Sequence, residues 1–332
     1  MTAVVPPTTA PGGGRGSTAR RFGRRDLTFD KISFMLVFLV LPVVGYVLFV
    51  VWPFIQAFYY SLTDWSGFTP GMNFVGFVNY GKILSDNIFL TAMRNSVTLL
   101  FVLPVVTLVI SLVFATLVTI GGPSQGPIRG LRNSSLYRVV SFFPYVIPAI
   151  VIGIIWSQVY TPGGLLNGVL TGVGLTQFQS FAWLGDPRTA MVATIFVIVW
   201  SLVGFYMVLF IAAIKGIPAE VFEAARIDGA GRLRTAVTIT IPLLRDNIQT
   251  AYIYMGILAL DAFVYMSALN PGGGPNNTTL VMSQQLFTTA FTKGQFGVAC
   301  AMGVVLAVIT LVFATIVFLV NRLTGGSNEV AE

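Results

Sequence analysis

The sequence has 332 residues, of which 55% are hydrophobic and only 9% are charged, whereas a soluble domain carries about 25% charged residues. This composition excludes a water-soluble globular protein and places the chain among membrane proteins. The single cysteine, Cys300, excludes an intrachain disulfide framework, and the sequence contains no histidine. Because histidine is the commonest general base and metal ligand, we expect neither hydrolytic catalysis nor a bound metal ion.

The first 30 residues form a basic segment rich in Pro, Gly and Thr, with few apolar side chains to bury. Such a composition predicts a disordered tail. The apolar run that follows, about 32–52, is too long for the hydrophobic core of a signal peptide, and no cleavage site follows it. We therefore expect this run to remain as a membrane anchor.

Six uncharged apolar runs are each long enough to cross a bilayer: about 32–52, 95–120, 139–160, 189–212, 247–269 and 297–320. They predict an all-α polytopic membrane domain over 31–322, with a short tail, 323–332, after it. If the runs cross alternately, 15 of the 19 basic residues fall in the loops on the side of the two termini. Because basic loops stay inside, we expect both tails in the cytoplasm, and the net charge of +7 requires no nucleic-acid partner.

One segment, GFVNYGKI at 76–83, has the glycine and lysine spacing of a phosphate-binding loop. That motif needs Ser or Thr after its lysine to hold magnesium, and here Ile83 follows Lys82. The segment is also expected outside the cell, where there is no ATP. We therefore expect this chain to bind no nucleotide and no other cofactor.

The densest charged segment of the folded region is the inner loop between the fourth and fifth runs, 213–245. Pro218 suits the first turn of a helix, and Glu220 is favourable near the positive N-terminal end of that helix. Gly229 is placed to end the helix in a left-handed conformation. A second amphipathic stretch, 231–241, then leads into the fifth run. The pattern predicts two short helices joined by a glycine turn, and on composition alone a solvated helix pair remains an equal alternative.

The spacing of particular residues makes this loop more specific. Glu223-Ala224-Ala225, three residues, Gly229, nine residues, Ile239, one residue and Ile241-Pro242 resemble the EAA loop of ABC-importer permeases. Around it, the chain from about 30 to 320 resembles the maltose-transporter type of permease, the first of its two permease types. The resemblance covers the segments 41–65, 73–96, 137–167, 181–218 and the Gly-Gly-Pro outer loop in 271–306. Ala236 departs from the pattern, which usually has a bulky aromatic there.

The resemblance implies an inner-membrane subunit of a bacterial sugar importer that has no catalytic site of its own. A second permease would complete the pore, two ATPase subunits would bind ATP and magnesium, and an extracytoplasmic binding protein would deliver the sugar. The residues implied to dock the ATPase are Glu223, Ala224, Ala225, Asp228, Gly229, Ile239 and Pro242.

A sugar pathway needs polar groups and aromatic faces inside the membrane. Asp261 is the only ionisable residue far from the end of a run, and helical spacing places Tyr254, Leu258, Asp261, Tyr265 and Ala268 on one face. An intramembrane acid is a functional hypothesis by default, although Asp261 could instead brace a neighbouring helix. Further candidates from other runs are Gln158, Trp200 and Tyr206.

A different class of protein, an ion-coupled secondary transporter, would use Asp261 as its coupling carboxylate. The 213–245 loop argues against it, because such a carrier needs no ATPase dock. The sequence does not identify the sugar. Because no run contains Arg or Lys that could hold a phosphate, a neutral sugar or an N-acetylated amino sugar is favoured.

Overall fold

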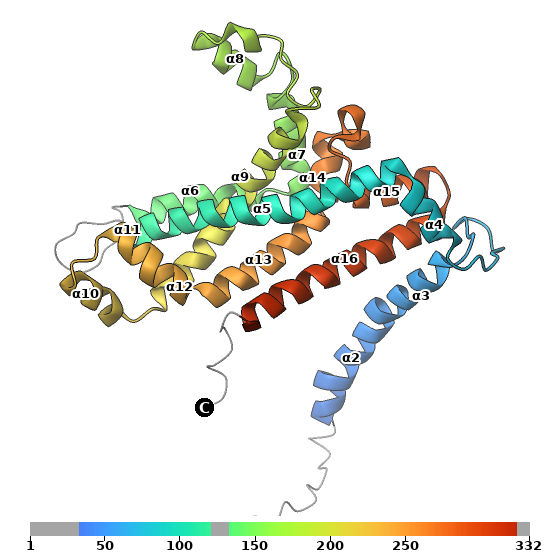
Figure 1. Cartoon of the computed structure of the whole chain (residues 1–332), viewed down its shortest axis with the longest axis horizontal. Helices are drawn as coiled ribbons and strands as arrows, with labels where there is room; N and C mark the ends of the chain where they lie inside the picture. The colour runs from blue at the N-terminus through green and yellow to red at the C-terminus, as the bar shows by residue number, and fades with distance from the viewer. Residues whose placement is uncertain (1–32, 121–132, 324–332) are drawn as a thin grey trace, which may run out of the picture. The chain divides into compact units, whose positions relative to one another are not determined.

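The computed structural model describes residues 33–120 and 133–323 (Figure 1). The described part is helical, and its only β pairing is an isolated bridge between Thr63 and Phe74. The all-α prediction is therefore confirmed for these residues. The predicted tails, 1–30 and 323–332, lie outside them except for Leu323. The chain divides into two compact units, residues 1–54 and 55–332.

The first unit contributes most of one long helix, Ser33–Ser61. It consists of η1 (Leu36–Val40), α2 (Leu41–Tyr46), η2 (Val47–Val51) and α3 (Trp52–Ser61). The two wide turns, η1 and η2, come directly before α2 and α3, whose second residues are Pro42 and Pro53. Proline lacks an N–H for the regular ladder, and a wider turn is one way in which a helix accommodates it. At 29 residues the helix is about 44 Å long, which exceeds the ~30 Å hydrocarbon core.

The second unit contains the remaining helices. Their bounds are α4 (Val78–Ser85), α5 (Asn87–Ile120), α6 (Ser134–Val146), α7 (Ala149–Val159), α8 (Leu165–Gly172), η3 (Thr176–Phe178), α9 (Ala190–Lys215), α10 (Ala219–Ile227), α11 (Arg232–Thr235), η4 (Ala236–Thr240), α12 (Ile241–Leu243), α13 (Arg245–Leu260), α14 (Phe263–Leu269), η5 (Pro271–Gly273), η6 (Pro275–Asn277), α15 (Met282–Phe287), η7 (Thr288–Thr292) and α16 (Phe296–Leu323).

The core lies around α9, which packs against both α5 and α6, while α13 packs against α5 and α7 against α14. In the most apolar part of α9, 61% of the residues are buried, compared with 6% in α16. Leu103, Met207 and Met255 meet in this core. The Ser111 hydroxyl donates a hydrogen bond of 2.9 Å to the Val203 carbonyl and so ties α5 to α9.

Small residues allow two of these helix pairs to approach closely. A Cβ atom at Gly204 of α9 would overlap the backbone of Ser141 in α6, and one at Gly153 of α7 would overlap Ala268 in α14. Small residues at helix contacts are typical of membrane proteins, because they let the two backbones come close enough for extensive van der Waals contact.

Within residues 33–120 and 133–323, four helices are each long and apolar enough to cross a membrane: Ser33–Ser61, Asn87–Ile120, Ala190–Lys215 and Phe296–Leu323. The other two predicted runs are bent helix pairs that meet the same criterion only as pairs. The α6–α7 pair bends by 96° and the α13–α14 pair by 47°. The first bend follows from Pro148, which cannot donate to the helix ladder and holds Ile147 in an extended conformation.

The second bend corrects an expectation. α13 ends at Leu260, and Asp261 and Ala262 have backbone angles outside the regular helix. The prediction of one continuous helical face from residue 254 to residue 268 was therefore wrong. The helical spacing that would align Tyr254 with Tyr265 does not continue across a break of 47°.

Candidate functional site

The connections between helices gather at two ends of the second unit. α10 and α11 lie at the end where α5 finishes and α6 begins, whereas α4 and α15 lie at the other end (Figure 1). We call these the α10 end and the α15 end. A cavity lined by Ile120, Ser134 and Phe222 confirms the first grouping. At the α15 end, the Asn95 side chain donates to the carbonyls of Asn277 and Leu280.

The segment 213–245, which we call the coupling loop after the role that its resemblance implies, forms the predicted helix, glycine turn and helix. α10 begins after Pro218 and ends at Ile227. Gly229 has a φ of +73°. The Gly229 N–H bonds to the Arg226 carbonyl at 2.9 Å, and the Ala230 N–H bonds to the Ala225 carbonyl at 2.8 Å. This pair of bonds is the Schellman ending of a helix, in which the left-handed residue is usually glycine.

The expected coupling residues do not all face the same way. Glu223 and Ala224 are exposed, as are Asp228, Gly229 and Pro242, whereas Ile239 is half-buried. Ala225 is only 5% exposed, because it packs against its own chain beside Phe222. Its small side chain therefore serves the packing of α10 onto the bundle.

Two apolar residues of the coupling loop were missed by the sequence analysis. Ile227 is 87% exposed and Leu233 is 79% exposed, and they lie on either side of the Gly229 turn. Their sequence signal was their apolar character within the most charged loop. Isolated apolar residues on a surface are common. Here, however, two of them flank the same turn, and Glu223 is exposed on α10, the helix that leads into this turn.

The expected pathway residues are dispersed. Tyr254 is 67% exposed on α13, and Asp261 is exposed at the helix break. Tyr265 is buried on α14, where its hydroxyl is 2.9 Å from that of Ser201 on α9. The five residues of the expected stripe therefore do not share one surface.

The candidates from the other helices are also separated. Gln158 is exposed near the end of α7, and Tyr206 is buried in the core. Trp200 packs edge-on against Trp156, with ring centroids 5.4 Å apart. Of the six pathway candidates from the sequence, only Tyr265 lines the cavity described next.

The two bent helix pairs border a cavity of about 560 Å³. Residues 145–149 at the α6–α7 bend line it, together with Leu202, Leu258 and Tyr265. Leu202 lies near the middle of α9, so the cavity is far from both ends of the bundle. Tyr145, which the sequence analysis missed, presents an aromatic ring here that stacks on Phe205 at 4.6 Å. The flanking residues, Pro144 and Pro148, were an available sequence signal for this break.

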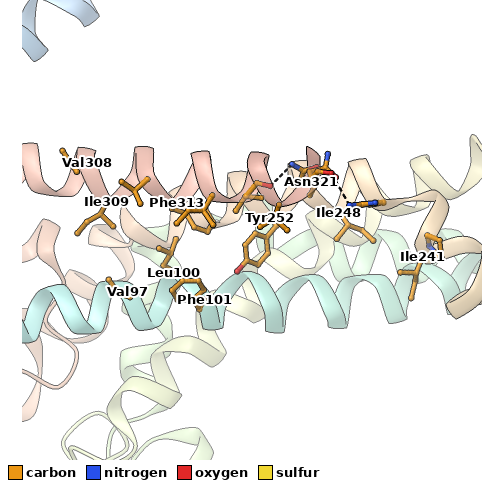
Figure 2. A pocket seen from close by; sticks show the side chains of 17 residues that line it. Val97, Leu100, Phe101, Ile241, Ile248, Tyr252, Val308, Ile309, Phe313 and Asn321 are labelled. Atoms are coloured by element: carbon orange, nitrogen blue, oxygen red, sulfur yellow. Dashed lines mark hydrogen bonds between the residues drawn. The ribbon is translucent and has the colours of Figure 1, made fainter. Parts of the chain in front are cut away.

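A second hollow has a different character. A groove of about 830 Å³ lies between α5, α13 and α16, and Figure 2 shows its wall of apolar side chains. Its few polar residues are engaged at one end, where Arg245 donates to the Asn321 carbonyl and Gln249 donates to the Val317 carbonyl, each at 3.4 Å (Figure 2). This groove offers little to a polar solute, because most of its wall has no hydrogen-bonding group.

The loop from Asn270 to Val281, here the α14–α15 loop, is held firmly at the α15 end. Gly272, Gly273 and Gly274 all have φ values between +68° and +93°. Val281 is completely buried, and the Asn270 amide donates to the Thr194 hydroxyl at 2.7 Å. The loop is therefore folded into the protein and is not a solvated connection.

Near it, the 62–79 segment is held by side-chain hydrogen bonds. The buried Asn79 amide donates to the carbonyls of Ser61 and Thr63. The Asp64 carboxylate accepts bonds from the backbone N–H of Asn73 at 2.6 Å and from its side chain at 3.0 Å. These two bonds hold the pKa of the Asp64 carboxyl below its ordinary value of 3.8.

A comparison with known protein families decides the identity of the chain. The family described as binding-protein-dependent transport system inner membrane component matches residues 128–325, which is more than half of the sequence. The chain belongs to this family. The predicted resemblance to ABC-importer permeases is thereby confirmed, and the chain is a non-catalytic transmembrane subunit of such a transporter.

Individual permeases of the family resemble the chain over most of its length. The diacetylchitobiose uptake system permease protein NgcF of Streptomyces coelicolor is 60% identical over 324 residues, which are 96% of this chain and 92% of that protein. The multiple sugar-binding transport system permease protein MsmF of Streptococcus mutans is 31% identical over 82% of this chain and 89% of its own length.

A solved structure supports the fold. In a bacterial alginate ABC transporter, crystallised in complex with an alginate pentasaccharide-bound periplasmic protein, one chain superimposes on this permease with a TM-score of 0.75. The two chains are 19% identical, and the match covers 92% of this chain and 100% of the other.

Proposed function

We propose that this permease imports an N-acetylated disaccharide of the diacetylchitobiose type as part of an ATP-driven sugar importer. The observation that carries the proposal is the 60% identity with a diacetylchitobiose permease over 96% of the chain. The interior supports it, because the six apolar runs, 32–52, 95–120, 139–160, 189–212, 247–269 and 297–320, contain no Arg or Lys that would hold a phosphate or acidic sugar. A neutral sugar with amide groups needs aromatic faces and hydroxyl partners, as the tyrosines of the central cavity provide.

We place six spans in the membrane, with each bent helix pair as one span and the α10 end in the cytoplasm. The support is the distribution of basic residues, of which 15 of 19 fall on the side of the termini. Reporter domains fused after Ala230 should read cytoplasmic, and those fused after Leu280 should read outside. A cytoplasmic reading at Leu280 would contradict the arrangement.

The coupling loop docks an ATPase subunit in this scheme. Ile227 and Leu233, exposed on either side of the Gly229 turn, enter a groove on the ATPase, and the Glu223 carboxylate pairs with a basic group there. ATP and magnesium bind to two such ATPase subunits. A second permease completes the pore, and a binding protein delivers the sugar from outside.

The sugar passes through the central cavity between the two broken spans. Broken helices near the middle of the membrane are the usual location of substrate sites in transporters, because their free backbone groups line a cavity. Tyr145 and Tyr265 would contact the sugar. Asp261 lies at the break between α13 and α14, but it is not among the residues that line the cavity.

An ion-coupled carrier that uses Asp261 is not favoured, since the chain belongs to a family of binding-protein-dependent permeases. Asp261→Asn separates the two functions. Uptake that depends on an external proton gradient, and loses that dependence in this variant, would favour the carrier.

Uptake of labelled diacetylchitobiose by cells tests the substrate. Cells that lack this permease should take up little of the disaccharide, and the intact gene should restore uptake that excess unlabelled diacetylchitobiose, but not maltose, suppresses. Tyr145→Ala should lower uptake while the amount of protein in the membrane stays normal. Equal suppression by maltose would overturn the proposed substrate.

A further inference from the structure

A separate cavity of about 310 Å³ lies at the α10 end, where four helices meet. The last turn of α5, the first turns of α6, the end of α9 and the beginning of α10 surround it. Its polar wall consists of Thr119, Ser134, Arg138 and Lys215. The rest of its wall is apolar and includes the buried side chains of Ile214 and Phe222.

The charge in this cavity is entirely positive. Arg138 and Lys215 line it, and no Asp or Glu is among the described residues of its wall. The nearest acids along the chain, Glu220 and Glu223, belong to α10 and are exposed outside the lining. Two cations facing one cavity without a carboxylate repel each other, and an anionic ligand would relieve that repulsion.

The guanidinium of Arg138 is oriented for such a ligand. Its Nε donates to the Ser134 carbonyl at 3.1 Å, and one terminal nitrogen donates to the Ser134 hydroxyl at 3.0 Å. These bonds use two of the five N–H donors of an arginine and fix the plane of the group. The remaining donors suit a phosphate, which arginine binds through paired hydrogen bonds.

The apolar part of the wall indicates where the phosphate comes from. Ile214 and Phe222 give the cavity a side that a soluble, fully hydrated phosphate would not need. The cavity also lies where the spans end, on the side with the basic loops. Basic pockets between membrane helices on the cytoplasmic side are suited to anionic lipid headgroups.

We propose that this cavity binds the phosphate of an anionic phospholipid from the cytoplasmic leaflet, with Arg138 and Lys215 as its cationic partners. The first part of an acyl chain lies against Ile214 and Phe222. Because α10 contributes Phe222 to the wall, the lipid lies directly behind the coupling helix and stabilises its position. The site is independent of which sugar is carried, and only the choice of leaflet rests on the proposed orientation.

Native mass spectrometry tests the site on the full chain with whatever subunits co-purify in detergent. Phosphatidylglycerol should bind at least about fivefold more tightly than phosphatidylcholine. Arg138→Gln and Lys215→Gln should each weaken phosphatidylglycerol about fivefold, and the double variant about 25-fold, as expected for the loss of one and two basic contacts at a membrane surface. Arg322→Gln is the matched control, because Arg322 is exposed at the end of α16 and does not line the cavity.

Each alternative result has a defined meaning. Equal phosphatidylglycerol affinity in the double variant and in Arg322→Gln would overturn the site. Displacement of the lipid by millimolar inorganic phosphate or glycerol phosphate would assign the cavity to a soluble ligand and overturn the lipid source. If Arg138→Gln is poorly folded, Lys215→Gln alone decides, since Lys215 is exposed at the end of α9. Reporter fusions test the orientation separately.

Discussion

The coupling loop and the α14–α15 loop connect membrane spans at opposite ends of the bundle, and both contain glycines with positive φ. They differ in where their apolar side chains go. In the α14–α15 loop, Leu280 and Val281 are 4% and 0% exposed. In the coupling loop, Ile227 and Leu233 are 87% and 79% exposed. The apolar side chains of the α14–α15 loop are covered by the rest of the chain. Those of the coupling loop stay exposed, and a partner subunit would cover them.

Glycine substitution should produce the largest effect and separate the two loops. At Gly273 (φ +93°) a Cβ atom would lie 2.8 Å from the Leu280 Cβ atom, so Gly273→Val combines backbone strain with overpacking. We expect a loss of about 3–5 kcal/mol of stability, seen as a lower melting temperature of the purified protein and a smaller amount in the membrane.

Gly229→Val is the matched comparison. Gly229 has a φ of +73°, but nothing lies within 4 Å of the added Cβ atom. Its strain of about 1–3 kcal/mol should displace the second half of the coupling loop, so that sugar uptake falls while the melting temperature stays near that of the wild type. Equal melting temperatures for the two variants would contradict the distinction between the loops.

Removal of the exposed apolar side chains should come next. The double variant Ile227→Ser, Leu233→Ser removes two side chains whose burial by a partner contributes about 2 kcal/mol each. We expect co-elution of the ATPase and sugar uptake to fall more than tenfold. Stability of the permease should be unchanged, because neither side chain is buried in this chain.

The control for that variant is Leu165→Ser on α8, where the leucine is 69% exposed and α8 projects beyond α7, away from the α10 end (Figure 1). This change should leave ATPase co-elution intact. A similar loss of co-elution in both variants would mean that exposed apolar area in general, and not the coupling loop, retains the ATPase.

The hydrogen bonds of the two loops give a smaller contrast. Thr194→Val leaves the buried Asn270 amide without its 2.7 Å acceptor and should lower stability by about 1–3 kcal/mol. Thr238→Val in the coupling loop removes only a bond from an exposed hydroxyl to the Arg234 carbonyl. That change should be within about 0.5 kcal/mol of the wild type. Thermal unfolding of the two purified variants measures the difference, and equal losses would contradict it.

The sequence predicted those features of both loops that depend on local residue types. The six apolar runs, the turn at Gly229 and the two coupling helices all follow from hydropathy, proline and glycine placement. The bend at Pro148 could have been predicted from the same rules. The break at Asp261 could not, because neither proline nor glycine occurs between residues 257 and 271.

The candidate pathway depended more on tertiary packing. Tyr265 lines the central cavity, whereas Tyr254 is exposed on α13, so the two side chains do not share one surface, and a role of either in the sugar pathway stays a prediction. Tyr145 faces the cavity only because the α6–α7 pair bends by 96°. The burial of the α14–α15 loop likewise depends on contacts with α5 and α9, which are distant in the sequence.

The smallest expected effect is a pH dependence at the α15 end. The Asn73 bonds lower the pKa of the Asp64 carboxyl, so this carboxylate stabilises the segment above its unfolded pKa and ceases to do so as the pH falls through the lowered folded value. Asp64→Asn should exchange amide hydrogens faster than the wild type in the 63–74 segment at pH 7. The difference should shrink as the pH falls below 3.8 and disappear once the pH is below the lowered folded pKa. A difference that persists there would exclude the charge as its cause.

Crosslinking from the exposed side chains is the most direct test of the proposal that the coupling loop docks an ATPase subunit. A photoreactive amino acid at Leu233, and in a second variant at Leu165, would be activated in intact cells that express the whole transporter. We expect a covalent product between the permease and an ATPase subunit from residue 233 and none from residue 165. An ATPase product from residue 165, or its absence from residue 233 in cells that take up the sugar normally, would contradict it.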